Sequence, residues 1–172
     1  QRAEGVQGKH SQKLLIFFEI NKLFYICNAL DNCAHQSPNN YKYMQPNHNV
    51  VGWFEIPVTN MDRAIAFYEA VLGYKLDRHQ MGPLDMAWFP WLENQAGSPG
   101  SLVCHADMYK PSTDGVLIYL TAFSGDLAHE LARVEPAGGK VLVPKTHIAE
   151  DYGYMGVFTD SEGNRVALHS RA

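Results

Sequence analysis

Three side chains suited to acid–base or metal chemistry fall in or beside stretches rich in strand-forming residues. Glu55 lies in VVGWFEIPV, His105 follows SLVC, and His169 lies in NRVALHS. A carboxylate in a pocket can have its pKa raised into the range where it acts as a general acid or base. A carboxylate and two imidazoles that converge could instead bind a divalent metal ion. Glu55 is therefore the candidate catalytic residue, and the three together are a candidate metal or acid–base cluster.

No larger catalytic motif accompanies these residues. The eight histidines include no H-E-x-x-H pair, and the chain has no Gly-rich phosphate loop and no G-x-S-x-G elbow. The formal net charge is −4 and the Lys and Arg residues are scattered, whereas a nucleic-acid-binding surface needs a basic patch. These features argue against a nucleic-acid partner and favour a small-molecule ligand.

The residues that follow Glu55 predict a strand and then an amphipathic helix. Thr59 begins a Thr-x-x-Asp capping box that ends at Asp62 and satisfies free amides at the start of a helix. Gly73 suits the left-handed conformation that often ends a helix. Apolar residues recur between these signals at helical spacing, at Ile65, Tyr68, Val71 and Leu72.

The same order of elements recurs in the second half of the chain. The strand-forming run GVLIYLTAF precedes a helix that Ser124 or Asp126 can cap and that ends before Gly139. Further strand candidates follow each helix: YKLDRHQ, LDMAWFPW and SLVCHADMY in the first half, and KVLVPKTHI, YMGVFTD and NRVALHS in the second. Each half therefore reads as βαβββ, with module one at residues 50–110 and module two at residues 115–170. The predicted fold class is α+β, with the two modules forming a paired, curled mixed sheet around a cavity.

Three motifs carry a resemblance to a known family: IPVTNMDRAIAFYEAVLGYKL, ELARVEPAGGKVLVP and YMGVFTDSEGNRVALHS. They resemble the vicinal oxygen chelate superfamily, which includes glyoxalases, bleomycin-resistance proteins and extradiol dioxygenases. The resemblance covers residues 50–170, and the chain looks most like bacterial glyoxalase-related proteins. It implies the glyoxalase/bleomycin resistance/dioxygenase fold, a ligand site in a cavity formed by the modules, and a homodimer.

The resemblance also bears on metal binding. Metal-dependent members place His or Glu ligands on the inward faces of the first, fourth, fifth and eighth strands. Carried onto this sequence, these positions fall on Trp53, at or beside Cys104, at Leu117 or Tyr119, and on Ala167. Trp, Leu and Ala do not coordinate a metal ion, so at most one usable ligand remains. No metal or other cofactor is expected at these positions, and metal-assisted glyoxalase activity is not expected either.

Two alternatives for Glu55 stay open. By strand alternation, Glu55 shares a face with Trp53, and His169 shares a face with Arg165. If His105 points to the same side, Glu55, His105 and His169 could still converge as a divalent-metal or acid–base cluster. Alternatively, Glu55 pairs with Arg165 or belongs to a hydrogen-bond network at the cavity wall, and the two histidines lie near solvent.

Aromatic side chains dominate the faces expected to line the cavity. The candidate substrate-binding residues are Trp53, Trp88, His105, Tyr119, Tyr154 and His169. Aromatic rings offer a large contact area with few polar anchors, which suits a flat or apolar small molecule. Individual rings could instead pack in the core or at a subunit interface.

Two functional hypotheses follow from this site. In the first, the chain is a glyoxalase-related enzyme with a lyase- or isomerase-like reaction, in which Glu55 is the acid or base. In the second, it is a non-catalytic binding or sequestration protein of the bleomycin-resistance type, which holds its ligand without chemistry.

The remaining sequence sets the domain boundaries and the setting. Residues 31–49 are polar and rich in Asn and Pro, so residues 1–43 are predicted to be an N-terminal extension and linker outside the core fold. Residues 44–172 then form the glyoxalase-like domain. The most apolar run, KLLIFFEINKLFYICNAL, is interrupted by Glu19 and Lys22 before it reaches the length of a membrane span. The three cysteines form no C-x-x-C pair, which favours a reduced, cytoplasmic setting.

Overall fold

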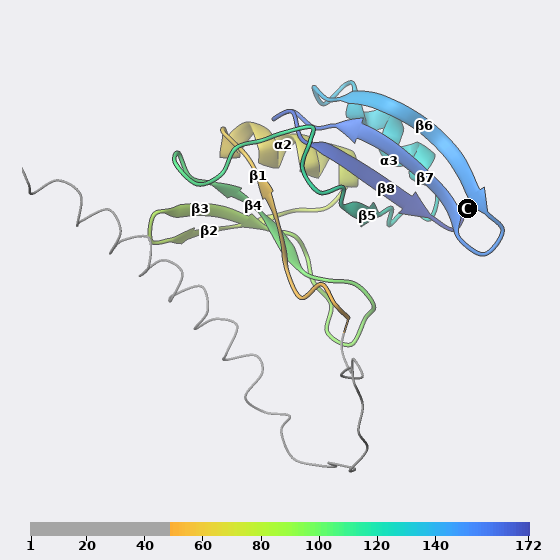
Figure 1. Ribbon diagram of the computed structural model, residues 1–172, viewed down its shortest axis with the longest axis horizontal. Coiled ribbons are helices and arrows are strands. Elements are labelled where there is room, and N and C mark those ends of the chain that lie inside the picture. The colour runs from red at the N-terminus through yellow and green to blue at the C-terminus, as the bar shows by residue number, and fades with distance from the viewer. Residues whose placement is uncertain (1–48) are drawn as a thin grey trace, which may run out of the picture. The chain divides into compact units, whose positions relative to one another are not determined.

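The computed structural model describes residues 49–172, which belong to one compact unit. The expected N-terminal extension, residues 1–43, lies outside the described residues. Two consecutive βαβββ modules make up the described part (Figure 1). The first consists of β1 (Phe54–Pro57), α2 (Met61–Leu72), β2 (Asp77–Met81), β3 (Leu84–Trp88) and β4 (Gly100–Cys104). The second consists of β5 (Tyr119–Thr121), α3 (Leu127–Val134), β6 (Lys140–Ala149), β7 (Gly153–Thr159) and β8 (Arg165–Ser170).

Each module builds a four-stranded mixed sheet. The strand order is β1-β4-β3-β2 in the first sheet and β5-β8-β7-β6 in the second. In both sheets the first and last strands of the module pair in parallel, and the other pairs are antiparallel. The predicted α+β fold of two βαβββ modules is therefore confirmed. Within residues 49–172 no ladder joins a strand of one sheet to a strand of the other, so the two sheets are not closed into one.

Helix α2 begins one residue later than the capping signal predicted. Asn60, not Thr59, is the N-cap, and its side chain accepts a hydrogen bond from the backbone N–H of Arg63 at 2.9 Å. Thr59 is occupied elsewhere, because its N–H and its hydroxyl both donate to the carboxylate of Glu162, at 3.0 and 2.8 Å. The end of the helix is as predicted, since Gly73 closes it with a φ of 79°.

Helix α3 begins at one of the two expected caps. The side chain of Asp126 accepts a hydrogen bond from the N–H of Ala128 at 2.9 Å, and Lys145 Nζ lies 2.7 Å from the same carboxylate oxygen. The hydrogen bond from Lys145 lowers the pKa of Asp126 the most, and the hydrogen bond from Ala128 lowers it further.

In the described part of the chain, no helix combines the length and the apolar character needed to span a membrane.

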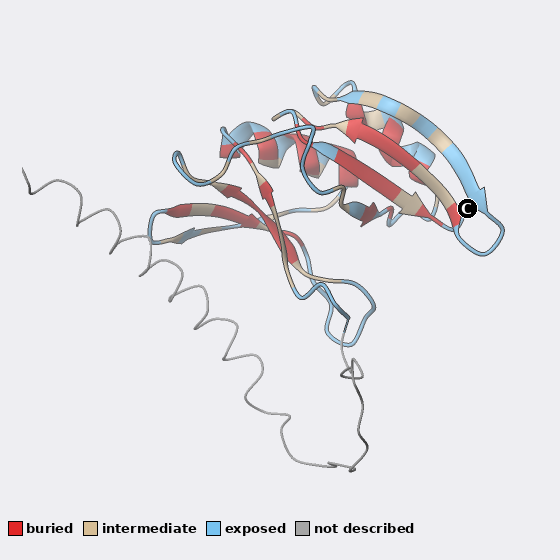
Figure 2. Ribbon diagram, in the orientation of Figure 1, coloured by how far each residue is buried: buried red, intermediate tan, exposed pale blue. Residues whose placement is uncertain are grey.

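The two modules share one hydrophobic core. Residues of both helices and of strands from both sheets belong to a single buried cluster. Phe67 of α2 marks the junction, because its ring lies 6.0 Å from the ring of Phe158 in β7 and 5.2 Å from the ring of Tyr68. Figure 2 shows the buried positions along β3, β4, β7 and β8, whereas β6 is exposed or half-buried along its length.

Strand alternation gives each sheet two faces with different roles. We call the face that packs on the helices the core face; on the first sheet it carries Ile56, Ala87 and Leu102, which all belong to the shared core. We call the opposite face the outer face. Several outer-face residues are buried yet lie outside the core cluster: Leu84, Met86 and Val103 on the first sheet, and Val157 and Ala167 on the second. Apolar packing therefore extends to both faces of each sheet.

Buried polar contacts also connect the modules. The hydroxyl of Tyr68 donates to Asp160 Oδ2 at 2.7 Å, and both residues are buried. Burial, and then the negative charge of Asp160, raise the pKa of Tyr68, so this hydroxyl stays protonated. Asn164 Nδ2 donates to the carbonyl oxygen of Pro57 at 2.8 Å. The turn before β8 is thereby fixed to the end of β1.

Candidate functional site

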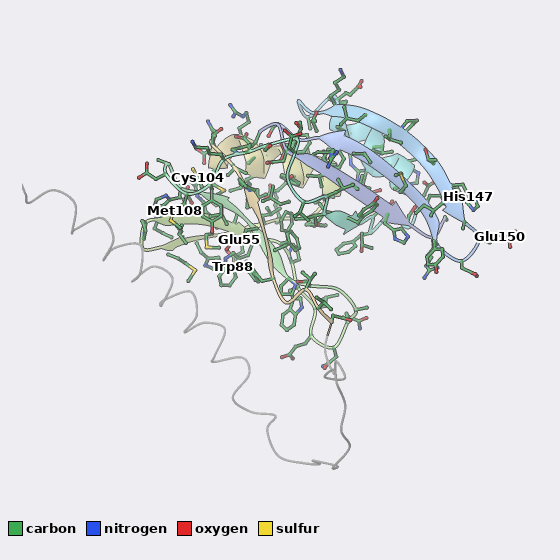
Figure 3. All side chains as sticks on the ribbon, viewed as in Figure 1. Glu55, Trp88, Cys104, Met108, His147 and Glu150 are labelled. Atoms are coloured by element: carbon green, nitrogen blue, oxygen red, sulfur yellow. The ribbon has the colours of Figure 1, made fainter. Side chains whose placement is uncertain are left out.

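The outer face of the first sheet collects three of the seven predicted site residues, namely Glu55, Trp53 and Trp88. Register places Glu55 of β1, Ser101 of β4 and Trp88 of β3 side by side on three neighbouring strands. Adjacent strands lie about 4.8 Å apart, so the side chains of neighbouring partners are within contact range. Asp77 of β2 continues the same row beyond Trp88. Figure 3 shows Glu55 and Trp88 together on this sheet. A carboxylate, a hydroxyl and an indole therefore form one line across the sheet.

Glu55 is positioned by a residue that sequence reasoning did not identify. The hydroxyl of Tyr109, in the segment that follows β4, donates to Glu55 Oε2. Burial raises the pKa of Tyr109, and the hydrogen bond to Glu55 and the charge of that carboxylate raise it further. Tyr109 therefore remains a hydrogen-bond donor at neutral pH and fixes the orientation of the Glu55 carboxylate. The predicted alternative partner was Arg165, but within residues 49–172 Glu55 forms no ion pair with it.

An aromatic group lies beside this carboxylate. The rings of Trp53 and Trp88 meet edge to face, with centroids 5.7 Å apart and an interplanar angle of 79°. His79 of the neighbouring strand β2 packs on Trp88, with ring centroids 4.2 Å apart. His79 Nε2 also lies 3.0 Å from Asp77 Oδ2, although the two atoms are not aligned for a hydrogen bond. Trp53 and Trp88 are thus brought together, and His79 joins them.

Among the described residues, three buried polar atoms of this face have no hydrogen-bond partner. They are the hydroxyl oxygen of Ser101, whose residue is fully buried, the indole nitrogen of Trp88, and Nε2 of His79. Buried polar groups in proteins are almost always paired, with protein groups, with water or with a ligand. Ser101 lies in register between Glu55 and Trp88, so the unpaired atoms of Ser101 and Trp88 belong to the row that contains the carboxylate. This row is the strongest candidate for a ligand-binding site.

Cys104, the last residue of β4, lies on the opposite face of the sheet from the candidate site. Cys104 pairs in register with Asp85 on the core face, and its thiol donates weakly to the carbonyl oxygen of Thr59 at 3.8 Å. Burial raises the pKa of Cys104, and the nearby carboxylates raise it further. His105 follows the strand, and its Nδ1 accepts a hydrogen bond from the N–H of Asp107 at 3.3 Å. Within residues 49–172 the hydrogen bonds of His105 are thus local, and none of them is to Glu55.

The remaining predicted residues lie on different faces of the second sheet. Tyr119 and His169 lie on its outer face, because Tyr119 is in register with Ala167, and His169 with Met155. His169 Nε2 lies 2.6 Å from the carbonyl oxygen of Tyr152. Tyr154 lies on the other face of this sheet, the core face.

Contacts around Tyr154 agree with that placement. Lys145 Nζ lies 4.4 Å from the centre of its ring, and the ring of His147 is 5.2 Å away. The ring is also packed against the shared core. Tyr154 therefore contributes to packing between β6, β7 and the core rather than to the face that holds Tyr119 and His169.

The metal positions implied by the resemblance do not fit a metal ion. Trp53 contacts Trp88, and Ala167 is fully buried beside Tyr119. Within residues 49–172, no group of three or more His, Cys, Asp or Glu side chains is close enough to hold a metal ion. The possible cluster of Glu55, His105 and His169 is therefore not assembled in the described chain.

Comparison with known proteins agrees with the fold. No curated protein sequence matches the chain. A glyoxylase/bleomycin resistance protein/dioxygenase domain from Frankia sp. EAN1pec is similar over 72% of this chain and 98% of its own, with 17% identity and a TM-score of 0.55. A glyoxalase/bleomycin resistance protein from Albidiferax ferrireducens T118 is similar over 72% of this chain and 100% of its own, with 15% identity and a TM-score of 0.51.

Glyoxalase I from Zea mays is also similar, with 18% identity and a TM-score of 0.52. The match covers 69% of this chain but 45% of the maize chain, so this chain spans less than half the length of that enzyme. At these identities the likeness concerns the fold alone. The sequence of residues 50–168, more than half of the chain, matches a family as well. The chain therefore belongs to the Glyoxalase/Bleomycin resistance protein/Dioxygenase superfamily.

Proposed function

We propose that this protein binds a small organic molecule of aromatic or apolar character on the outer face of its first sheet. The observation that carries the proposal is the row of Glu55, Ser101 and Trp88, in which two buried polar atoms lack partners within residues 49–172. A ligand with polar atoms at one end would satisfy both, and its apolar part would pack on the indoles. Trp53 lies just before β1 rather than within it, and it is the side chain expected to move when a ligand enters.

Glu55 is the residue that exchanges a proton with the ligand if the protein is an enzyme. Tyr109 donates to one carboxylate oxygen, which leaves the other oxygen to accept a proton from the ligand. A lyase- or isomerase-like reaction that begins with removal of a proton needs no more than such a base and a positioned substrate.

Sequestration without chemistry is the second candidate. It is favoured by the residues that stand at the family's metal positions, because Trp53 and Ala167 offer packing surface and no ligand atoms. Both candidates require the same binding site, and they differ only in what Glu55 does there.

Ligand binding is tested first, by a thermal-shift screen of small aromatic compounds on the full chain. A compound that binds the folded state at 100 times its Kd stabilises the protein by about 2.7 kcal/mol, which gives a clear rise in Tm. We expect Trp53→Ala to weaken binding of such a compound by on the order of tenfold or more, since it removes a large contact surface. Phe123→Ala is the matched control, because Phe123 is an exposed aromatic residue that packs on Tyr74. Equal losses in the two variants would contradict the proposed location.

Turnover of the bound compound then separates enzyme from sequestration protein. We expect Glu55→Gln to lower kcat by on the order of 100-fold, the usual contribution of a general acid or base. A compound that binds the wild-type protein and is recovered unchanged after long incubation supports sequestration instead. A kcat that is unaffected by Glu55→Gln would remove Glu55 from the chemistry.

A further inference from the structure

Resting on the proposed function, we propose that the ligand of the first sheet's outer face carries a protonated amine, held by Glu55 and Ser101 next to the indoles of Trp53 and Trp88. The charge of this face and its hydrogen-bonding capacity both favour such a ligand. An aromatic amine is a single chemical class, whereas the proposed function leaves the class of the ligand open.

The outer face of the first sheet carries negative charge. Glu55 and Asp77 lie in one row with Ser101 and Trp88 between them, and the side chain of Asp77 is 80% exposed. Alternation places no Lys or Arg at the strand positions of this face, which all lie in the described part of the chain. Arg78, the nearest basic strand residue in sequence, is on the core face, where it pairs with Asp62 and Asp85. A cation is therefore favoured on this face, and an anion is repelled.

Hydrogen-bonding capacity favours an amine in particular. An ionised carboxylate only accepts hydrogen bonds, and Tyr109 fills one oxygen of Glu55 but not the other. The hydroxyl of Ser101 is buried, has no partner in the described part of the chain and can accept a hydrogen bond from the same ligand group. A protonated amine supplies up to three donors from one atom, so it can donate to the second carboxylate oxygen of Glu55 and to the hydroxyl oxygen of Ser101 at once.

The two indoles add a second attraction for a cation. A cation within about 6 Å of an indole ring is attracted by the negative face of the ring, most strongly when both are shielded from water. Trp53 and Trp88 present rings at nearly right angles, so a group beside them meets a face of one and an edge of the other. His79 is the basic residue at these strand positions, and its Nε2 lies 3.0 Å from the carboxylate of Asp77, away from Glu55.

The test compares three probes of nearly equal size: 2-phenylethylamine, 2-phenylethanol and phenylacetate, which are a cation, a neutral molecule and an anion at pH 7. Their Kd values are measured on the full chain by ligand-detected NMR. We expect the amine to bind more tightly than the alcohol by on the order of tenfold, as for a hydrogen bond to a charged group. Phenylacetate is expected to bind most weakly. In Glu55→Gln the Kd values of amine and alcohol should differ by no more than about twofold.

Glu135→Gln is the matched control, because Glu135 is exposed and lies at the end of α3, so it changes the net charge equally without touching the first sheet. It should keep the preference for the amine. Ser101→Ala is a second variant, chosen in case Glu55→Gln folds poorly. It removes a buried hydroxyl that has no partner among residues 49–172, so it should weaken amine binding several-fold without lowering the Tm.

The outcomes separate this inference from the proposed function. If the alcohol binds as tightly as the amine, or Glu55→Gln keeps the preference, the inference is overturned while binding at this face stands. If none of the three probes binds, the proposed site fails for small aromatic ligands, and the inference fails with it.

Discussion

Replacing Glu162 with Gln is expected to lower the free energy of unfolding by about 2–3 kcal/mol at neutral pH, the cost of losing hydrogen bonds to a charged group. The side chain of Glu162 is fully buried, whereas that of Arg63, its partner at 2.7 Å, is 54% exposed. Solvent therefore screens part of the attraction, and the cost stays below the 3–5 kcal/mol typical of breaking a fully buried pair. Chemical denaturation of the two proteins at pH 7 measures the difference.

The effect is large because one carboxylate serves several donors at once. Glu162 accepts hydrogen bonds from the N–H groups of Thr59 and Asn60, from the hydroxyl of Thr59, and from the guanidinium of Arg63. It lies in the turn before β8, and the donors lie at the start of α2. Unpaired N–H groups at a helix start favour an anion, so Glu162 links the two modules at that point.

The same contacts predict how stability depends on pH. Burial alone would raise the pKa of Glu162, but the hydrogen bonds from Arg63, Thr59 and Asn60 together outweigh it and lower the pKa from 4.5 to about 2. A carboxyl whose pKa is lower in the folded state contributes stability that is complete above the unfolded pKa. We therefore expect this contribution to be lost as the pH falls from about 4.5 to about 2.

Glu162→Gln should then unfold with a weaker dependence on pH across that range, since Gln does not titrate. Glu135→Gln, at an exposed carboxyl, is the control and should keep the wild-type dependence. If Glu162→Gln and the wild-type protein lose stability in parallel between pH 4.5 and pH 2, the contacts of Glu162 are not what stabilises the folded chain at neutral pH.

The fold could be predicted from the sequence because its signals are local and occur twice. Gly73, Asp126 and the apolar stripes fix the two helices, and strand runs follow each helix in the same order. The shift of the N-cap from Thr59 to Asn60 could not be predicted, because it depends on Glu162, which is distant in sequence. Local propensity does not contain such a contact.

The candidate site was predicted in part. Alternation along β1 correctly groups Trp53 with Glu55, and ring contacts add Trp88. Alternation along β7 puts Tyr154 on the same face as Phe158, and this signal was available, because Phe158 is the obvious core residue of that strand. Tyr109 lies in an irregular segment, where sequence gives no period from which to derive the direction of a side chain.

The second large prediction concerns the hydrophobic core that the two modules share. Phe67→Ala is expected to lower the free energy of unfolding by about 3–5 kcal/mol, the usual cost of removing a buried Phe. Phe67 is 1% exposed and packs on Tyr68 and Phe158. The backbone is also fitted to its ring, since a Cβ added at Gly139 would lie 2.7 Å from it. The ring therefore fills the junction between the modules, and the cavity left by Ala cannot close without moving both.

That junction makes the prediction specific, because both modules should lose stability together. All three tryptophans lie between residues 53 and 91, so their fluorescence reports on the first module. Amide hydrogen exchange in β7 and β8 reports on the second. In Phe67→Ala both probes should give the same lowered free energy of unfolding. Val157→Ala, on the outer face of the second sheet and outside the shared core, should cost less. Slow exchange in β7 and β8 after the tryptophans of Phe67→Ala have become exposed would mean that the modules fold separately, and that a shared core does not determine the positions of the two outer faces.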